Sequence, residues 1–136
     1  MAPPLVVRHV ADPERSEHWP EFKAFLEPAR VRGGCDTLIG PNEVLWAVLD
    51  GNKAIGAATA RLLVDDTAEV VLVGGVRHRE WIKELDDRIG AAAAEAGATH
   101  LRAYGRRGWL KSLCANGWER KGQRDGFVAY ERELRH

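Results

Sequence analysis

The chain has 136 residues, and its 20 lysines and arginines are balanced by 20 aspartates and glutamates. This length favours one domain, and with 45% hydrophobic residues the chain can bury a core without disulfides or metal ions. The zero net charge argues against a nucleic-acid or membrane partner held by bulk attraction. The charge is unevenly divided, however, since residues 1–100 carry 11 basic and 16 acidic side chains and residues 101–136 carry 9 and 4.

The two cysteines, Cys35 and Cys114, are too few for a disulfide framework or a four-ligand zinc site, and they favour reduced thiols. The five histidines lack the spacing of a metal site, so no metal is expected. The N-terminus lacks the basic segment and apolar core of a signal peptide, and no apolar run reaches the roughly 18 residues of a membrane helix. The sequence therefore predicts a cytoplasmic location after synthesis.

All six prolines lie in the first third of the chain, which should be divided into short pieces. Residues 5–10 are sufficiently apolar and β-branched for a first strand. Residues 12–14 (Asp-Pro-Glu) predict a helix start, and apolar side chains at helical spacing predict a helix over 16–26. Pro28 and Gly33-Gly34 should end that region, and residues 35–42 should form a loop or a short helical turn.

The middle of the chain predicts strands joined by tight turns. Strands over 43–49 and 53–63 should flank a hairpin turn at 50–52, because Gly and Asn tolerate a positive φ. Gly56 indicates a bulge or a point of close approach within the second of these strands. Residues 68–73 are almost continuously apolar, which is typical of a strand buried on both faces.

The second half predicts the longest helix, over residues 80–96, with an apolar stripe at helical spacing and Gly97 as its stop. A strand over 100–104, a short helix over 107–115 and a hairpin of strands 118–123 and 127–134 follow. The order β-α-β-β-β-α-β-α-β-β predicts a single α+β (mixed α/β) domain over residues 1–136. Its central sheet should be mostly antiparallel and flanked by helices.

This element order, together with residues 43–118, resembles the GNAT acyltransferase fold. The passage LWAVLDGNKAIGAATARLL resembles the central hairpin of that fold, and AEVVLVGGV resembles its fourth strand. HLRAYGRRGWLKSLCANGWE resembles its fifth strand, short helix and terminal turn. The string GRRGW at 105–109, with Gly117 and Trp118, is similar to a narrower group, the small GNAT-like proteins of tailed bacteriophages and prophages.

The resemblance implies an acyl-CoA cradle, a Gly-rich turn where free N–H groups and the positive end of the long helix attract a diphosphate. Glu80 and Ile82 stand at its two small-residue positions, where Glu80 would repel the diphosphate and Ile82 would obstruct its approach. The cradle is therefore expected to be degenerate and the chain to bind no cofactor, with acetyl-CoA as the alternative. The residues of this degenerate site are Val73, Gly74, Gly75, Val76, Arg77, His78 and Arg79.

The resemblance also implies a Tyr as general acid before the terminal turn and often a Glu in the fourth strand as general base. Leu113 occupies the Tyr position and cannot transfer a proton, and the adjacent Cys114 is expected to be a small buried residue. Glu69 lies in the fourth strand, but a polar edge residue explains it better. The catalytic residues stay unassigned.

The basic segment 101–136 carries the candidate partner-binding residues, because Arg and Trp dominate binding hot spots. They are Gly105, Arg106, Arg107, Gly108, Trp109, Lys111, Arg120 and Lys121. A protein partner is expected, such as a virion component, and nucleic acid is disfavoured because the rest of the chain is acidic and no nucleic-acid motif is present. A head-to-tail contact between neighbouring copies is a further hypothesis.

Two functions follow. The first is a phage-type GNAT-like protein with a degenerate acyl-CoA site, acting as a virion-associated or other protein-binding structural module. The alternative is an active acyl-CoA-dependent N-acetyltransferase of an amine, with Arg77, His78 and Arg79 near the diphosphate. Glu80, Ile82 and Leu113 favour the first.

Overall fold

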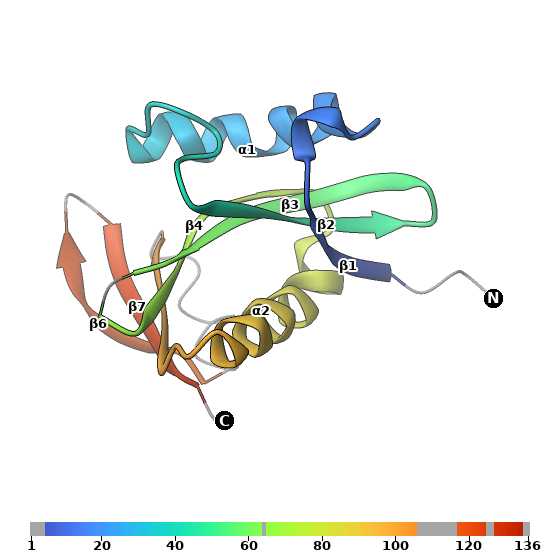
Figure 1. Ribbon diagram of the computed structural model, residues 1–136. Coiled ribbons are helices and arrows are strands. Elements are labelled where there is room, and N and C mark those ends of the chain that lie inside the picture. Colours follow the sequence, from blue (N-terminus) through green and yellow to red (C-terminus); the bar gives the residue numbers. More distant parts are fainter. Residues whose placement is uncertain (1–4, 64, 106–116, 125–126, 135–136) are drawn as a thin grey trace.

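The computed structural model describes residues 5–63, 65–105, 117–124 and 127–134 (Figure 1). Its 7-stranded sheet has the order β1-β2-β3-β4-β5-β7-β6, and neighbouring strands are antiparallel except β4 and β5. The predicted α+β fold with a mostly antiparallel sheet is confirmed. The strands are β1 (Leu5–Val10), β2 (Glu43–Asp50), β3 (Lys53–Leu62), β4 (Thr67–Gly75), β5 (His100–Gly105), β6 (Glu119–Arg124) and β7 (Phe127–Glu133).

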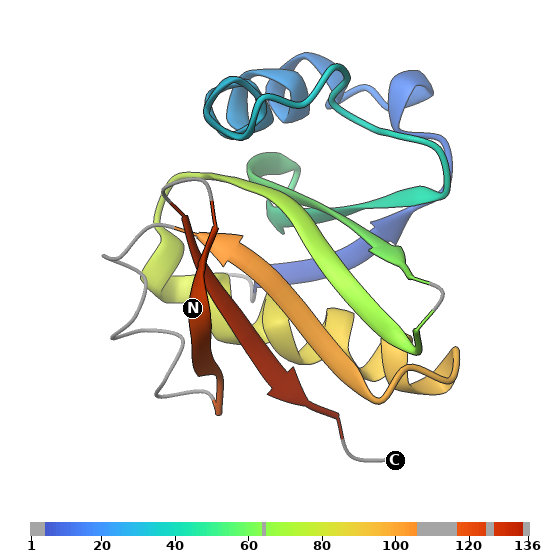
Figure 2. The ribbon, with the colours of Figure 1, turned by 90° about the vertical axis from the view of Figure 1, so that its left-hand side faces the viewer.

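Two helices cover opposite faces of the sheet (Figure 1, Figure 2). Helix α1 (Trp19–Gly33) packs on β3 and β4 from one side, preceded by a 3₁₀ turn, η1 (Pro13–Arg15). Helix α2 (His78–Glu95) lies on the other side. Each helix contributes buried apolar residues to a separate core cluster, which divides the core into an α1 side and an α2 side. The helix residues in these clusters are Phe22, Leu26, Trp81, Leu85, Ile89 and Ala93.

The helix predicted over 16–26 is α1, but it begins three residues later and continues through Pro28 to Gly33. A proline inside a helix cannot bond to the carbonyl four residues earlier, here that of Ala24. Ala24 and Pro28 are both exposed, so water can satisfy that carbonyl. The expectation that Pro28 ends the helix is therefore wrong, whereas the stop expected at Gly33-Gly34 is confirmed. The helix ends where Gly34 adopts the left-handed conformation, with φ 66°.

The helix predicted over 80–96 is α2, which begins two residues earlier. It lies close to β3, because a Cβ atom at Gly56 would be 2.7 Å from the ring of Trp81. The close approach predicted at Gly56 is confirmed, and the register between β2 and β3 also shifts beside it, skipping Ile55. Gly56 thus sets the distance between the helix and the sheet.

The remaining predicted strands coincide with those of the sheet to within two residues at each end. The strand predicted over 118–123 begins one residue later, and Trp118 before it is buried in the core on the α2 side. The helix predicted over 107–115 lies outside the described residues. Within the described ranges, no helix is long and apolar enough to span a membrane, and no three His, Cys, Asp or Glu side chains are grouped to hold a metal ion.

Candidate functional site

The two parallel strands, β4 and β5, pair along only part of their length. Their register ends at Val70↔Ala103, although β4 continues to Gly75. On its other side, the register of β4 against β3 skips Val71, which is the extra residue of a bulge. The backbone of residues 71–75 therefore has no strand partner on this side within the described sheet.

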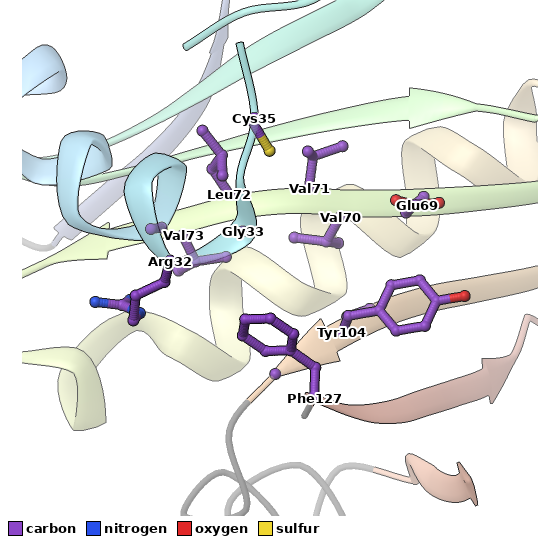
Figure 3. A pocket seen from close by; sticks show the side chains of 13 residues that line it. Arg32, Gly33, Cys35, Glu69, Val70, Val71, Leu72, Val73, Tyr104 and Phe127 are labelled. Atoms are coloured by element: carbon purple, nitrogen blue, oxygen red, sulfur yellow. The ribbon is translucent and has the colours of Figure 1, made fainter. Parts of the chain in front are cut away.

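A cavity of about 270 Å³ lies at this opening (Figure 3). It is bounded by β4 and β5, by the end of α1 with the loop that follows, and by the start of β7. Figure 3 shows Tyr104 and Phe127 together on one side of it, with Cys35 across from them. The lining residues are Ala29, Arg32, Gly33, Cys35, Glu69, Val70, Val71, Leu72, Val73, Ala103, Tyr104, Gly105 and Phe127. The wall is thus largely apolar, with a few polar groups that could act on a bound molecule.

Glu69 is the carboxylate of this cavity, and it is held between two arginines. Arg61 of β3 and Arg102 of β5 lie directly opposite it in the sheet, and a guanidinium nitrogen of each is 3.5 Å from a carboxylate oxygen. Glu69 is 9% exposed and lies in a central strand, so its interpretation as a polar edge residue is wrong. A fixed carboxylate at a cavity is a group that can accept a proton from a substrate.

The connection from β4 to α2 is held by two hydrogen bonds. The N–H of Val76 donates to the carbonyl of Ile55 at 2.8 Å, and the indole Nε1 of Trp81 donates to the carbonyl of Val76 at 2.6 Å. These bonds anchor the first turn of α2 just after the unpaired end of β4. The N–H of Glu80 donates to the carbonyl of Arg77 at 3.0 Å, whereas those of His78 and Arg79 have no partner within the helix, and the N-cap residue Arg77 makes no side-chain capping bond. Such a helix end attracts anions.

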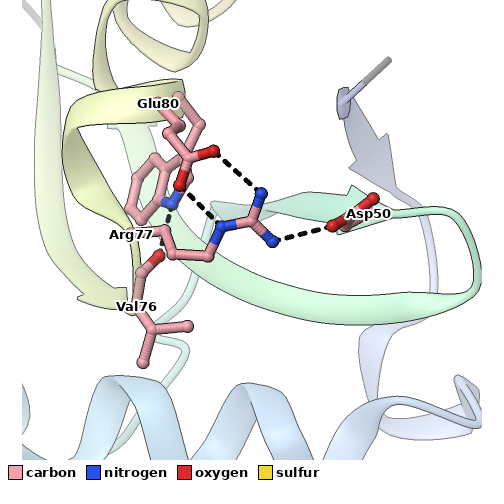
Figure 4. A network of polar contacts seen from close by, with 5 residues as sticks. Asp50, Val76, Arg77 and Glu80 are labelled. Carbon is pink, nitrogen blue, oxygen red and sulfur yellow. Dashed lines mark hydrogen bonds and ion pairs between the residues drawn. The ribbon is translucent and has the colours of Figure 1, made fainter. Parts of the chain in front are cut away.

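Arg77 forms a three-residue ion-pair network with Asp50 and Glu80 (Figure 4). Its Nε and Nη2 donate to the two carboxylate oxygens of Glu80 at 2.6 and 2.8 Å, and its Nη1 donates to Asp50 at 2.7 Å. The hydrogen bonds from Arg77 lower the pKa of Glu80, and those to Glu80 and Asp50 raise the pKa of Arg77. The network joins the β2–β3 hairpin to the start of α2.

Glu80 and Ile82 stand where an acyl-CoA cradle has small residues, and the two lie in different surroundings. Glu80 is exposed and bound to Arg77. Ile82 is half-buried and packs against the core on the α2 side, so its side chain belongs to the packing of the helix on the sheet. Of these two residues, Glu80 is the one that presents its side chain to an anion at the helix start.

The glycines predicted for the cofactor site have packing roles. A Cβ atom at Gly74 would collide with the backbone carbonyl of Phe25, and one at Gly75 would collide with that of Ile55. Gly74 thus allows α1 to approach the sheet, and Gly75, with φ 144°, allows β4 to approach β3. Of the other predicted cofactor residues, Val73 lines the cavity, Val76 and Arg79 are exposed, and the ring of His78 lies 5.0 Å from that of Trp81.

Most of the predicted partner-binding residues lie outside the described part of the chain, namely Arg106, Arg107, Gly108, Trp109 and Lys111, as do Leu113 and Cys114. Gly105 is buried and lines the cavity. Arg120 and Lys121 are exposed on β6, and the Nζ of Lys121 is 3.1 Å from a carboxylate oxygen of Glu119. The partner surface and the head-to-tail contact stay predictions.

The sequence did not point to the residues that line the cavity from other elements: Arg32, Cys35, Tyr104 and Phe127. Their meeting depends on where α1 ends and on how far β4 and β5 separate. One sequence signal could have indicated Tyr104. Arg102 and Tyr104 alternate with buried residues along β5, so the two share one face of the sheet.

No protein-family model matches the chain, and no curated protein matches its sequence. Solved structures do match its fold. The IAA acetyltransferase of Bacillus cereus has a TM-score of 0.71 at 14% identity, over 96% of this chain and 99% of that chain. The chain has the GNAT fold. Two further GNAT structures are similar, the PaiA N-acetyltransferase of Thermoplasma acidophilum (TM-score 0.66, 15% identity) and an acetyltransferase of Bacillus subtilis (0.69, 12%). Each comparison covers 96% of this chain and 99% of the other.

Both of these last structures are complexes with coenzyme A. They contradict the expectation that the chain binds no cofactor, so that prediction was wrong. The error came from giving Glu80 and Ile82 more weight than the element order. None of the comparisons bears on a phage origin or a place in a virion.

Proposed function

We propose that the protein is an acyl-CoA-dependent N-acyltransferase, with acetyl-CoA as donor and an amine as acceptor. The observation that carries this proposal is the separation of β4 from β5 after Val70, with the bulge at Val71 and a cavity of about 270 Å³ at the opening. Two acetyltransferase structures that contain coenzyme A are similar to this chain over nearly their whole length, and this similarity supports the proposal.

The described residues fit coenzyme A in two places. Its pantetheine arm is an extended chain with amide groups, and residues 71–75 offer unpaired backbone groups along the edge of β4, as in the addition of a strand to a sheet. The diphosphate fits the start of α2, two residues after β4, where the N–H groups of His78 and Arg79 have no partner within the helix. The bound donor would supply an acyl thioester that an amine can attack.

The acceptor fits the cavity on the α1 side of the sheet. Its amine must lose a proton before or during acyl transfer, and Glu69 is the carboxylate that lines this cavity. Arg61 and Arg102 fix the position of Glu69 from both sides, so the carboxylate can accept the proton directly or through a water molecule. The hydroxyl of Tyr104, in the wall of the same cavity, is a candidate proton donor to the leaving thiolate.

The experiment is to measure CoA release from acetyl-CoA with a panel of amines, for the wild type and Glu69→Gln. The amide cannot act as a base, so turnover should fall by about a hundredfold or more while CoA still binds. The matched control is Glu131→Gln, because Glu131 lies opposite Arg102 on β7 but is not among the cavity residues. A wild type that releases no CoA with any amine would contradict the proposal.

A further inference from the structure

We propose that Asp50 and Glu80 limit the affinity for CoA by holding the guanidinium of Arg77, the N-cap residue of α2, away from the diphosphate. This inference rests on the proposed function. It concerns residues that the structure joins in one network: Arg77 before α2, Glu80 in the first turn of α2, and Asp50 at the β2–β3 hairpin. The network is shown in Figure 4.

Most donors of the Arg77 guanidinium are engaged, since three of its five N–H groups donate to carboxylates of the network. Three of its nitrogens donate at 2.6, 2.7 and 2.8 Å, two to Glu80 and one to Asp50. Paired, charge-assisted bonds of this kind are among the stronger hydrogen bonds in proteins. A diphosphate can form a paired bond with the Nε and Nη2 edge of Arg77 only by displacing Glu80, and the two remaining N–H groups are on nitrogens that already bond a carboxylate.

The charges also oppose the ligand. One arginine and two carboxylates leave the network with a net negative charge beside a helix end that would otherwise attract anions. All three side chains are partly exposed, at 41% for Arg77, 51% for Glu80 and 30% for Asp50, so the network is open to an approaching ligand. Removal of one negative charge about 7 Å from a doubly charged anion in water strengthens binding about five- to tenfold at low ionic strength.

The network has a second role that explains its presence. A carboxylate in the first turn stabilises a helix, and the bond from Arg77 to Asp50 ties the helix start to the β2–β3 hairpin. Glu80 therefore contributes to stability at the expense of donor affinity. Loss of its charge should shift these two properties in opposite directions, whereas a purely structural residue would leave CoA affinity unchanged or weaker.

The test is calorimetric titration with CoA at low ionic strength of the wild type, Glu80→Gln, Asp50→Asn and the double variant Arg77→Gln/Glu80→Gln. Glu80→Gln should bind CoA about fivefold or more tightly, Asp50→Asn should change in the same direction, and the double variant should lose the gain. The control is Glu84→Gln, which removes the same charge one turn further along α2, where Glu84 pairs with Arg88 at 2.9 Å. Its gain in CoA affinity should be clearly smaller than that of Glu80→Gln, because the removed charge is farther from the diphosphate.

Equal CoA affinity in the wild type and Glu80→Gln would overturn the inference while leaving the proposed function intact. A double variant that binds as tightly as Glu80→Gln would overturn it as well, because Arg77 would then not reach the diphosphate. Failure of every variant to bind CoA would instead overturn the proposed function, and the inference with it.

Discussion

Asp86 is a buried carboxylate that ties α2 to the C-terminal hairpin. The indole Nε1 of Trp118 donates to its Oδ2 at 2.9 Å, and a guanidinium nitrogen of Arg132 is 3.3 Å from its Oδ1. Gly90 leaves the space for this arginine, since a Cβ atom there would collide with the guanidinium. Desolvation by burial raises the pKa of Asp86, although the bonds from Trp118 and Arg132 act in the opposite direction. The carboxylate is thus costly to keep ionised but well positioned.

The raised pKa of Asp86 predicts a signature in the pH dependence of stability. The folded chain binds this proton more tightly than the unfolded chain, so the contribution of Asp86 to the unfolding free energy falls as pH rises from the unfolded pKa through the raised folded value. Asp86→Asn removes this fall, and the unfolding free energy of the variant should then rise more steeply with pH just above 3.8 than that of the wild type. Urea unfolding at several pH values measures it, and parallel pH profiles would contradict it.

Among elements, the position of α1 determines the cavity. Gly74 lets the backbone of α1 approach β4 at Phe25, and Ala29 and Gly33 near the end of the same helix line the cavity. The helix position and the shape of the acceptor site therefore depend on one missing side chain in β4.

Gly74→Ala should displace α1, because the obstacle to the new methyl group is backbone and not a flexible side chain. Overpacking of this kind costs about 1–3 kcal/mol of unfolding free energy, and the variant should also lose acceptor turnover. Gly33→Ala is the control, since its Cβ would lie 3.4 Å from the Sγ of Cys35 within a helix, where alanine is favoured. Urea unfolding measures the stability of both variants, and CoA release with an amine measures the turnover of Gly74→Ala. Equal stability of Gly74→Ala and the wild type would refute the role of this contact.

The elements could be predicted to a large extent because apolar periodicity is a local signal. The strands and α2 follow from it. The passage of α1 through Pro28 could not be predicted, because it depends on the exposure of the carbonyl at Ala24. The opening between β4 and β5 could not be predicted either, since the point where two parallel strands separate depends on how they twist and pack in three dimensions. Glu69 was noticed in the sequence, but its burial between Arg61 and Arg102 was not visible there.

At the scale of the whole molecule, the acidic and basic parts of the chain meet within the fold. Arg102 pairs with Glu69 and Arg132 pairs with Asp86, so two cations of the basic segment are bound to carboxylates of the first hundred residues. Some of the opposite charges that sum to zero are therefore paired with each other inside the fold. This reduces the positive charge that segment 101–136 can offer to a partner.

The central claim is that the opening between β4 and β5 holds an acyl-CoA. The most direct test is the unfolding free energy of the wild-type protein with and without CoA. At a free CoA concentration of a hundred times its dissociation constant, the unfolding free energy should rise by about 2.7 kcal/mol, with one CoA bound per chain. No change in unfolding free energy with CoA or acetyl-CoA at millimolar concentration would contradict the account.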